Sequence, residues 1–172
     1  MSLVYGDDSS AAPVPVPQGF KTQPAIACLQ SIAAITVAQS ASVFAVVTDA
    51  DGWVGGTILN SPLPAGGGFT ISEVAGTITV PRAMIVRIKY TLSGFTVVVG
   101  VRTAAIFGGA TNATRLGGTC QGAEVAGAGQ TLVGEVIASV AAGDILSIKT
   151  IESTAGSMVI AAACATFTVE EI

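Results

Sequence analysis

The sequence contains no histidine. Histidine is the commonest general base and a frequent ligand of transition metals, so its absence removes the usual serine-hydrolase triad and most transition-metal sites. The glycines form neither GxGxxG nor GxxxxGK after a strand pattern. Five carboxylates, Glu73, Glu124, Glu135, Asp144 and Glu152, lie in strand or turn patterns that predict positions on solvent faces or in turns. We therefore expect a protein that is not an enzyme and that uses no cofactor or metal.

Charged residues are also scarce. The 172-residue chain has seven basic and eleven acidic residues, or 10%, whereas soluble domains average about 25%. Hydrophobic residues make up 51% of the chain, and the mean hydropathy is +0.72. A solitary monomer of this composition would expose sizeable apolar patches, which usually mark interfaces. The composition therefore predicts a homo-oligomer.

The sign and spacing of the remaining charges limit the partners. A net charge of −4 with scattered basic residues disfavours nucleic-acid binding, because phosphate neutralisation needs clustered Lys and Arg. No run of about 20 apolar residues is present, so we expect no membrane span. Asp7 and Asp8 lie where a signal peptide would have its apolar core, which favours synthesis in a cytoplasm.

The three cysteines, Cys28, Cys120 and Cys164, are an odd number without close spacing. This spacing excludes a Cys-x-x-Cys metal motif. Small buried thiols are the expected state, although pairing of Cys28 with another thiol stays open.

The clearest structural signal lies in Gly68–Phe107. Apolar residues alternate with polar ones there, first as Ile78 and Val80 against Thr77 and Thr79, then as Val86, Ile88, Tyr90 and Leu92 against Arg87, Lys89 and Thr91. A period of two predicts strands with one buried face. Pro81 and Ser93-Gly94 punctuate the runs, so the connections are too short for helices. The pattern predicts an all-β, antiparallel β-sandwich.

Further strands are expected at intervals of about 8–12 residues, as in a sandwich or jelly roll. We predict strands over Leu132–Val140, Ile145–Ile151 and Met158–Val169, the last with Ala161, Ala163, Ala165 and Phe167 on one face. Ala25–Thr48 fits either a short helical face or strands, and its β-branched residues favour strands. Gly108–Gln130 is expected to be a long loop with one short strand around 116–121.

Residues 1–24 differ in composition from the rest and predict an extended arm preceding a single domain of residues 25–172. Prolines at alternate positions favour a polyproline-like segment. Two interpretations remain: a disordered tail, or a strap that becomes ordered on a neighbouring subunit. The residues expected to make contacts in the second case are Pro13, Val14, Pro15, Val16, Pro17 and Phe20.

Two other groups are candidate binding residues. The basic residues of the central stretch are either a solvated face or a strip that meets acidic groups of a partner, and they are Arg82, Arg87, Lys89 and Arg102. Asp49 and Asp51 form a turn that lacks the later ligands of a calcium loop, so a bound cation there stays open. Trp53 follows directly and is expected to be a half-buried anchor.

Three segments, GTITVPRAMIVRIKYTLSG, VAAGDILSIKTIES and ATFTVEEI, resemble the jelly roll of the tumour-necrosis-factor and complement globular-head superfamily. The resemblance covers about residues 36–172. It implies an inward aromatic at Tyr90, a Gly143-Asp144 turn before the penultimate strand, and Phe167 in the closing strand. Arg82-Ala83 departs from the family pattern, in which a Gly is more typical.

The resemblance implies a homotrimer in which one sheet of each subunit packs about the threefold axis. Versions of this fold that are rich in Ala, Gly, Val and Thr and carry an extended arm are similar to bacteriophage virion proteins. This implies a capsid decoration or cement protein, found in the virion and made in the host cytoplasm, with the major capsid protein or neighbouring virion subunits as partners. One alternative is a fibre head that recognises a host glycan or protein through Gly108–Gln130 and the loop around Trp53; another is a bacterial structural or adhesive subunit.

Overall fold

The computed structural model describes residues 25–39, 43–48, 53–58, 68–95, 100–123, 130–153 and 156–172, with only the backbone described for 53–58, 123, 156 and 157. These residues form strands and turns and no helix. Accordingly, nothing in these ranges is a helix of the length and hydrophobicity that a bilayer crossing requires. The strands are β1 (Ile26–Ser31), β2 (Ile35–Gln39), β3 (Ala45–Val46), β4 (Trp53–Ile58), β5 (Thr70–Ser72), β6 (Thr77–Thr79), β7 (Met84–Ser93), β8 (Val101–Gly108), β9 (Thr114–Ala123), β10 (Thr131–Val140), β11 (Ile145–Glu152), β12 (Gly156–Ile160) and β13 (Ala165–Glu171).

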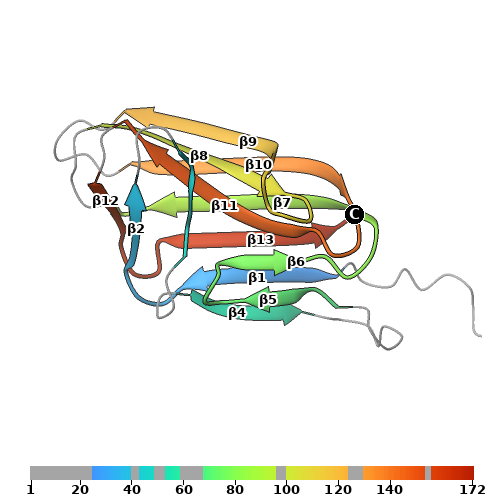
Figure 1. Ribbon diagram of the computed structural model, residues 1–172. Helices are drawn as coiled ribbons and strands as arrows, with labels where there is room; N and C mark the ends of the chain where they lie inside the picture. The colour runs from blue at the N-terminus through green and yellow to red at the C-terminus, as the bar shows by residue number, and fades with distance from the viewer. Residues whose placement is uncertain are drawn as a thin grey trace, which may run out of the picture.

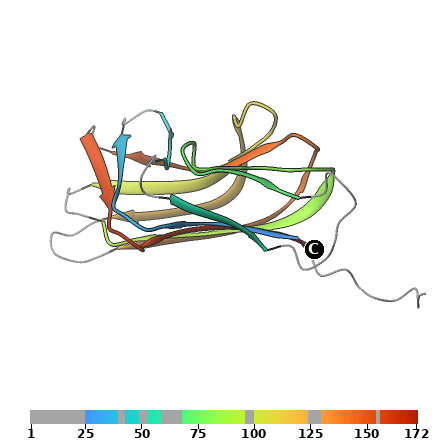
Figure 2. The same ribbon diagram turned by 90° about the horizontal axis from the view of Figure 1, so that it is seen from below.

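The strands form two stacked antiparallel sheets (Figures 1 and 2). The first sheet has the order β10-β7-β13-β1-β4, and the second has the order β5-β6-β11-β8-β9, with β3 pairing to β11 beside this path. Strands β2 and β12 form a separate pair at one end of the sandwich (left in Figure 1). Because β6, β7 and β8 alternate between the sheets, the predicted short connections cross from layer to layer. The predicted antiparallel sandwich is confirmed.

The core lies between the two sheets and follows the alternation in the sequence. On β7 the burial alternates residue by residue, and the four predicted inward residues, Val86, Ile88, Tyr90 and Leu92, are at most 1% exposed. Phe167 on β13 is fully buried opposite Tyr90 in the register. The inward positions predicted for Tyr90 and Phe167 are therefore confirmed.

The predicted turn between β10 and β11 is also present. Gly143 has a φ of 83°, a left-handed conformation that glycine adopts without a Cβ penalty. The Asp144 carboxylate accepts a hydrogen bond from the Ala141 amide at 2.9 Å. Backbone hydrogen bonds from Gly143 N to Val80 O (2.8 Å) and from Val80 N to Asp144 O (2.9 Å) tie this turn to the end of β6.

Two predicted elements differ from the structure in their bounds. The closing strand predicted over Met158–Val169 is two strands, because the chain turns at Ala161–Cys164, where Ala163 has a φ of 59°. Ala163 is consequently exposed and does not share a face with Ala165. The short strand predicted around 116–121 within Gly108–Gln130 is present, but as the ten-residue strand β9, paired with β8, it is longer than predicted. Strands are confirmed in Ala25–Thr48, as β1, β2 and β3.

Candidate functional site

The outer surface of β7 and β10 is the strongest candidate for a functional surface. The register places Arg87 opposite Ile137, Lys89 opposite Glu135 and Thr91 opposite Val133, all on outward positions. We call this surface the β7–β10 face and define it by Ile85, Arg87, Lys89, Val133, Glu135 and Ile137.

Opposite charges form a row across the β7–β10 face. Arg87 Nε lies 3.4 Å from a Glu135 carboxylate oxygen, and Lys89 Nζ lies 3.8 Å from the other. Arg87 Nη1 lies 3.6 Å from Glu170 on the neighbouring strand β13. The row therefore contains two cations and two anions, so its formal charge is balanced within one chain.

Apolar side chains flank this row. Ile85, Val133 and Ile137 are 52%, 56% and 55% exposed. Ile85 and Ile137 are diagonal neighbours in the register, within reach of each other on one face of the sheet. The C-terminal residue, Ile172, is 53% exposed and donates its backbone N–H to Ile85 O at 3.1 Å. Within the described ranges, four of the seven exposed large hydrophobic side chains thus gather at this surface.

The structure separates the four residues of the predicted basic strip. Arg87 and Lys89 lie together on the β7–β10 face, as predicted from their spacing. Arg82 lies two residues before the start of β7 and donates from both Nη atoms to the Glu171 carboxylate, at 2.7 and 2.8 Å. The acidic groups that these three residues meet belong to the same chain.

Arg102 does not belong to this strip, because it lies on β8 in the other sheet and is fully buried. Its Nε is 3.4 Å from the carboxylate of Glu152, its register partner on β11. Its guanidinium lies 4.9 Å from the centroid of the Phe95 ring. The prediction of a solvent or turn position for Glu152 is therefore wrong: its side chain is 1% exposed and shares the buried face of β11 with Ile148 and Thr150.

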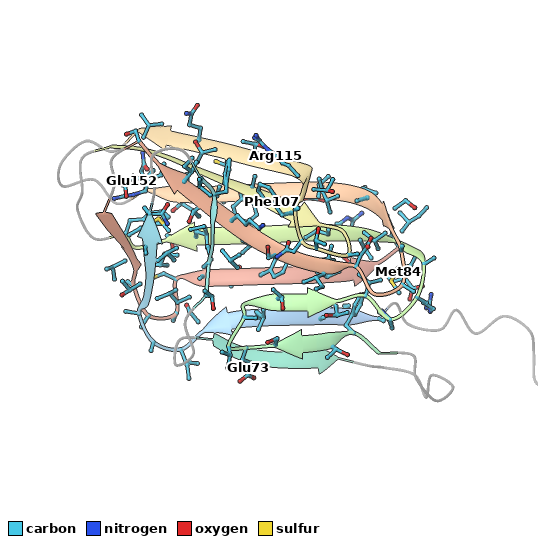
Figure 3. All side chains as sticks on the ribbon, in the orientation of Figure 1. Glu73, Met84, Phe107, Arg115 and Glu152 are labelled. Atoms are coloured by element: carbon cyan, nitrogen blue, oxygen red, sulfur yellow. The ribbon has the colours of Figure 1, made fainter. Side chains whose placement is uncertain are left out.

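A second group of side chains lies on the outer surface of the other sheet. The rings of Phe44 and Phe107 are 5.2 Å apart between centroids, at an interplanar angle of 53°. The Arg115 guanidinium lies 5.6 Å from the Phe44 centroid, and Lys149 Nζ lies 4.7 Å from the Phe107 centroid. We call these four residues the cationic–aromatic cluster; Figure 3 labels Arg115 on β9 and Phe107 on β8.

Tyr90 joins the two sheets from inside the core. Its hydroxyl group is 2.8 Å from Gly118 O on β9 and 3.0 Å from Ala104 O on β8, so its single proton is shared between two carbonyl groups. Burial, and secondarily the nearby Cys120 thiol, raises the pKa of Tyr90 well above its ordinary value of 10.0. This residue is part of the structural framework of the sandwich.

Two hollows open at the end of the sandwich where β2, β3 and the start of β8 lie. One, of about 410 Å³, lies between β2 and β3 and is lined by Thr36, Val37, Ala38, Ala45, Val46 and Thr48. The other, of about 270 Å³, is lined by Val101, Thr103, Gln121, Ile151, Glu152 and Ser153. Glu152 is the one titratable residue in either lining, and it is already paired with Arg102. Among the described residues, no three His, Cys, Asp or Glu side chains are placed to hold a metal ion.

Several predicted binding residues lie outside the described residues: Pro13, Val14, Pro15, Val16, Pro17, Phe20, Asp49, Asp51 and the Trp53 side chain. The arm, and the domain boundary at residue 24, therefore stay predictions. Cys28, Cys120 and Cys164 are free thiols, each only partly buried where full burial was expected.

The fold has counterparts among solved structures. No protein-family model and no curated protein matches the sequence. Among solved structures, the Eiger TNF of S. frugiperda aligns with a TM-score of 0.60 at 11% identity, over 87% of this chain and 93% of that one. Murine APRIL aligns with a TM-score of 0.59 at 13% identity, over 87% and 100%. The globular domain of zebrafish complement 1qA aligns with a TM-score of 0.54 at 12% identity, over 87% and 97%.

These likenesses establish the class of fold. The chain is a jelly roll of the tumour-necrosis-factor and complement-head type, as the sequence resemblance implied. At sequence identities of 11–13%, these likenesses show a shared fold and not a shared function.

Proposed function

We propose that the chain is a non-enzymatic structural protein that assembles as a homotrimer through the β7–β10 face, and that it decorates and stabilises the shell of a virus particle. The observation that carries the assembly is the grouping of Ile85, Val133 and Ile137 around a charge-balanced row. The sequence resemblance supports the threefold arrangement. The scarcity of charge and the Pro-rich arm at residues 13–20 support the role in a virion.

The apolar side chains supply a driving force of useful size. Fully burying a Val or Ile side chain contributes about 1.5–3 kcal/mol, so covering one that is half exposed contributes about 1 kcal/mol. Three such side chains in each of three subunits give roughly 9 kcal/mol. Forming a trimer takes two associations, each of which costs roughly 4–15 kcal/mol in lost translational and rotational freedom, so further contacts must complete the interface.

The charge-balanced row would be covered together with these side chains. Burying an unpaired ion costs several kcal/mol, but Arg87 and Lys89 already lie near carboxylates of their own chain. Their pairing lowers the penalty of removing water from the face and fixes how a neighbouring subunit can be oriented.

Native mass measurement of the full chain tests the assembly. We expect wild-type protein at three times 17.0 kDa and Ile85→Lys/Ile137→Lys as a monomer. A charge-matched control, Ile32→Lys/Val74→Lys, changes side chains that are 63% and 66% exposed outside this face and should remain trimeric. A wild-type monomer would exclude the trimer, and a trimeric Ile85→Lys/Ile137→Lys variant would exclude this face.

Binding to capsid shells that lack the protein tests the virion role. Deleting residues 1–24 should leave a folded trimer that no longer binds the shells, because the arm is proposed to make the contacts with the shell. Co-sedimentation with the shells measures this. Undiminished co-sedimentation of the deletion variant would refute the arm's role without affecting the assembly test.

A further inference from the structure

The cationic–aromatic cluster contains the two described basic residues that lack an acidic partner. The chain has seven basic residues, of which Lys21 lies outside the described residues. Four of the other six, Arg82, Arg87, Lys89 and Arg102, each form an ion pair within the chain. Arg115 and Lys149 form none with the part of the chain that the structure describes. In a chain of net charge −4, two neighbouring cations without a counter-charge among the described residues are unexpected.

The two cations are held in place by neutral groups. Arg115 Nε and one Nη donate to the Thr119 hydroxyl, the former at 3.1 Å. Lys149 Nζ donates to the backbone carbonyl of Asn112, whose side-chain Oδ1 accepts from Ser147 Oγ at 2.9 Å. A guanidinium has five N–H donors and an ammonium has three, so both groups keep donors that these contacts do not use.

The aromatic pair sets the environment of these charges. Phe107 is only 8% exposed, so both charges lie beside apolar surface; Lys149 is itself half-buried, whereas Arg115 is exposed. Partial burial lowers the pKa of the Lys149 ammonium from its ordinary value. Reduced access of water strengthens any ion pair that an incoming anion forms there.

We propose that the cationic–aromatic cluster is a binding site for two carboxylates, and that its occupant is the Asp7-Asp8 pair in the N-terminal segment of this protein. The segment offers two adjacent carboxylates for two cations, and Tyr5 provides a ring near them for the aromatic pair. An acidic segment of another protein would have the same chemistry. A tethered segment has an effective concentration in the millimolar range, which favours it over a free competitor.

The length of the chain allows this contact. Sixteen residues separate Asp8 from Ala25, where the described structure begins. At about 3.3 Å per residue they span up to roughly 50 Å. A domain of this size has a radius of gyration of about 15 Å, so the segment can reach across its own domain or onto the near side of an adjoining copy.

Carbodiimide cross-linking of the full chain tests the contact directly, because this reagent joins a lysine amine to a nearby carboxylate as an amide with loss of water. The chain contains only three lysines, Lys21, Lys89 and Lys149, so the products are easily assigned by mass spectrometry. Lys89 and Glu135, 3.8 Å apart, provide an internal positive control. We expect a product between Lys149 and Asp7 or Asp8, and its loss in Asp7→Asn/Asp8→Asn with the Lys89–Glu135 product unchanged.

Arg115→Gln should reduce the yield of the Lys149 product at least threefold, because one of the two cations is removed. Mixing unlabelled and ¹⁵N-labelled protein tells whether the segment comes from the same or a neighbouring copy, and either product supports the site. Formation of the Lys89–Glu135 product alone, or a Lys149 product with a carboxylate other than Asp7 or Asp8, would overturn the proposal.

A second measurement covers the case in which Lys149 reacts slowly. Acetylation of Lys149, relative to Lys89, should be at least twofold faster in Asp7→Asn/Asp8→Asn than in wild type, because the carboxylates no longer cover the amine or hold it charged. Equal relative rates in the two proteins would count against occupation of the cluster by this segment.

Discussion

Replacing Tyr90 with Phe tests how the two sheets are held together. The change keeps the buried ring and removes only the hydroxyl group, which lies 2.8 Å from Gly118 O and 3.0 Å from Ala104 O. One hydrogen bond contributes about 0.5–1.5 kcal/mol net, and a buried acceptor left without a donor costs about 1–3 kcal/mol. We therefore expect the free energy of unfolding to fall by about 2 kcal/mol.

Urea unfolding followed by circular dichroism, at one fixed protein concentration, measures this loss. With a slope of about 2 kcal/mol per M, the midpoint should fall by about 1 M while the slope stays unchanged. A fall of less than about 0.5 kcal/mol, below the net contribution of one hydrogen bond, would show that the hydroxyl group does not stabilise the contact between the sheets.

The same variant should change the dependence of stability on pH. Burial raises the pKa of Tyr90 in the folded state above its ordinary value of 10.0. The unfolded chain therefore releases this proton at a lower pH than the folded chain, so this contribution to stability is fully present below pH 10 and is lost as the pH rises further. Wild type should lose stability more steeply than Tyr90→Phe between pH 10 and 11, and parallel curves would refute the assignment.

Two further substitutions test close packing and the buried ion pair by the same assay. In Gly134→Ala the new Cβ would lie 2.1 Å from Gly118 O and 2.2 Å from a Tyr90 ring carbon, so we expect the free energy of unfolding to fall by about 3 kcal/mol or more. Gly143→Ala is the control, because no atom lies within 4 Å of its new Cβ. It should lower the free energy of unfolding by only about 1 kcal/mol, because alanine is disfavoured at a left-handed φ. Glu152→Gln removes the negative charge beside the buried Arg102 and should lower the free energy of unfolding by about 3–5 kcal/mol. Its control, Glu171→Gln, changes the partly exposed pair with Arg82 and should lower it by no more than about 1 kcal/mol. Equal losses in either pair of variants would contradict the burial found for these sites.

The sandwich could be predicted because its core depends on a local pattern. Residues i and i+2 of a strand share a face whatever their partners are, so the sequence alone indicates which side chains of β7 and β10 point inward. The pairing of β2 with β12 could not be predicted in this way. It joins Ile35 to Ile160, and nothing within either segment indicates so distant a partner.

The burial of Arg102 and Glu152 shows where residue type and periodicity disagree. Arg102 shares its strand face with Ala104 and Ile106, and Glu152 shares its face with Ile148 and Thr150. Counted from these buried neighbours, a period of two places both residues inward, whereas their charge favours solvent. Each could be buried because the other is its cross-strand partner, a fact of register that the sequence does not contain.

No alternation of apolar and polar residues in the sequence indicated the cationic–aromatic cluster. The register between β8 and β9 shifts between Ala104 and Ile106 and again before Phe107, so alternation does not indicate which side of the sheet Arg115 occupies. Gly117 and Gly118, both with positive φ, permit this irregular path. Phe44 joins the cluster from just before a two-residue strand, too short to show a period.

The two outer surfaces of the sandwich therefore differ in how their charges are balanced, and this separates the two proposed interactions. On the β7–β10 face, Arg87 and Lys89 are paired within the chain, so covering that face creates few new ion pairs and depends on apolar contact. At the cationic–aromatic cluster, the carboxylates proposed to pair with Arg115 and Lys149 belong to a segment outside the described residues. Binding there would therefore form new ion pairs and depend on charge. Raising the ionic strength from about 0.1 to 1 M shortens the screening length from about 10 to 3 Å. The trimer mass should survive this change while the Lys149 cross-link declines, and a trimer that dissociates in salt would place its driving force in charge pairs between subunits.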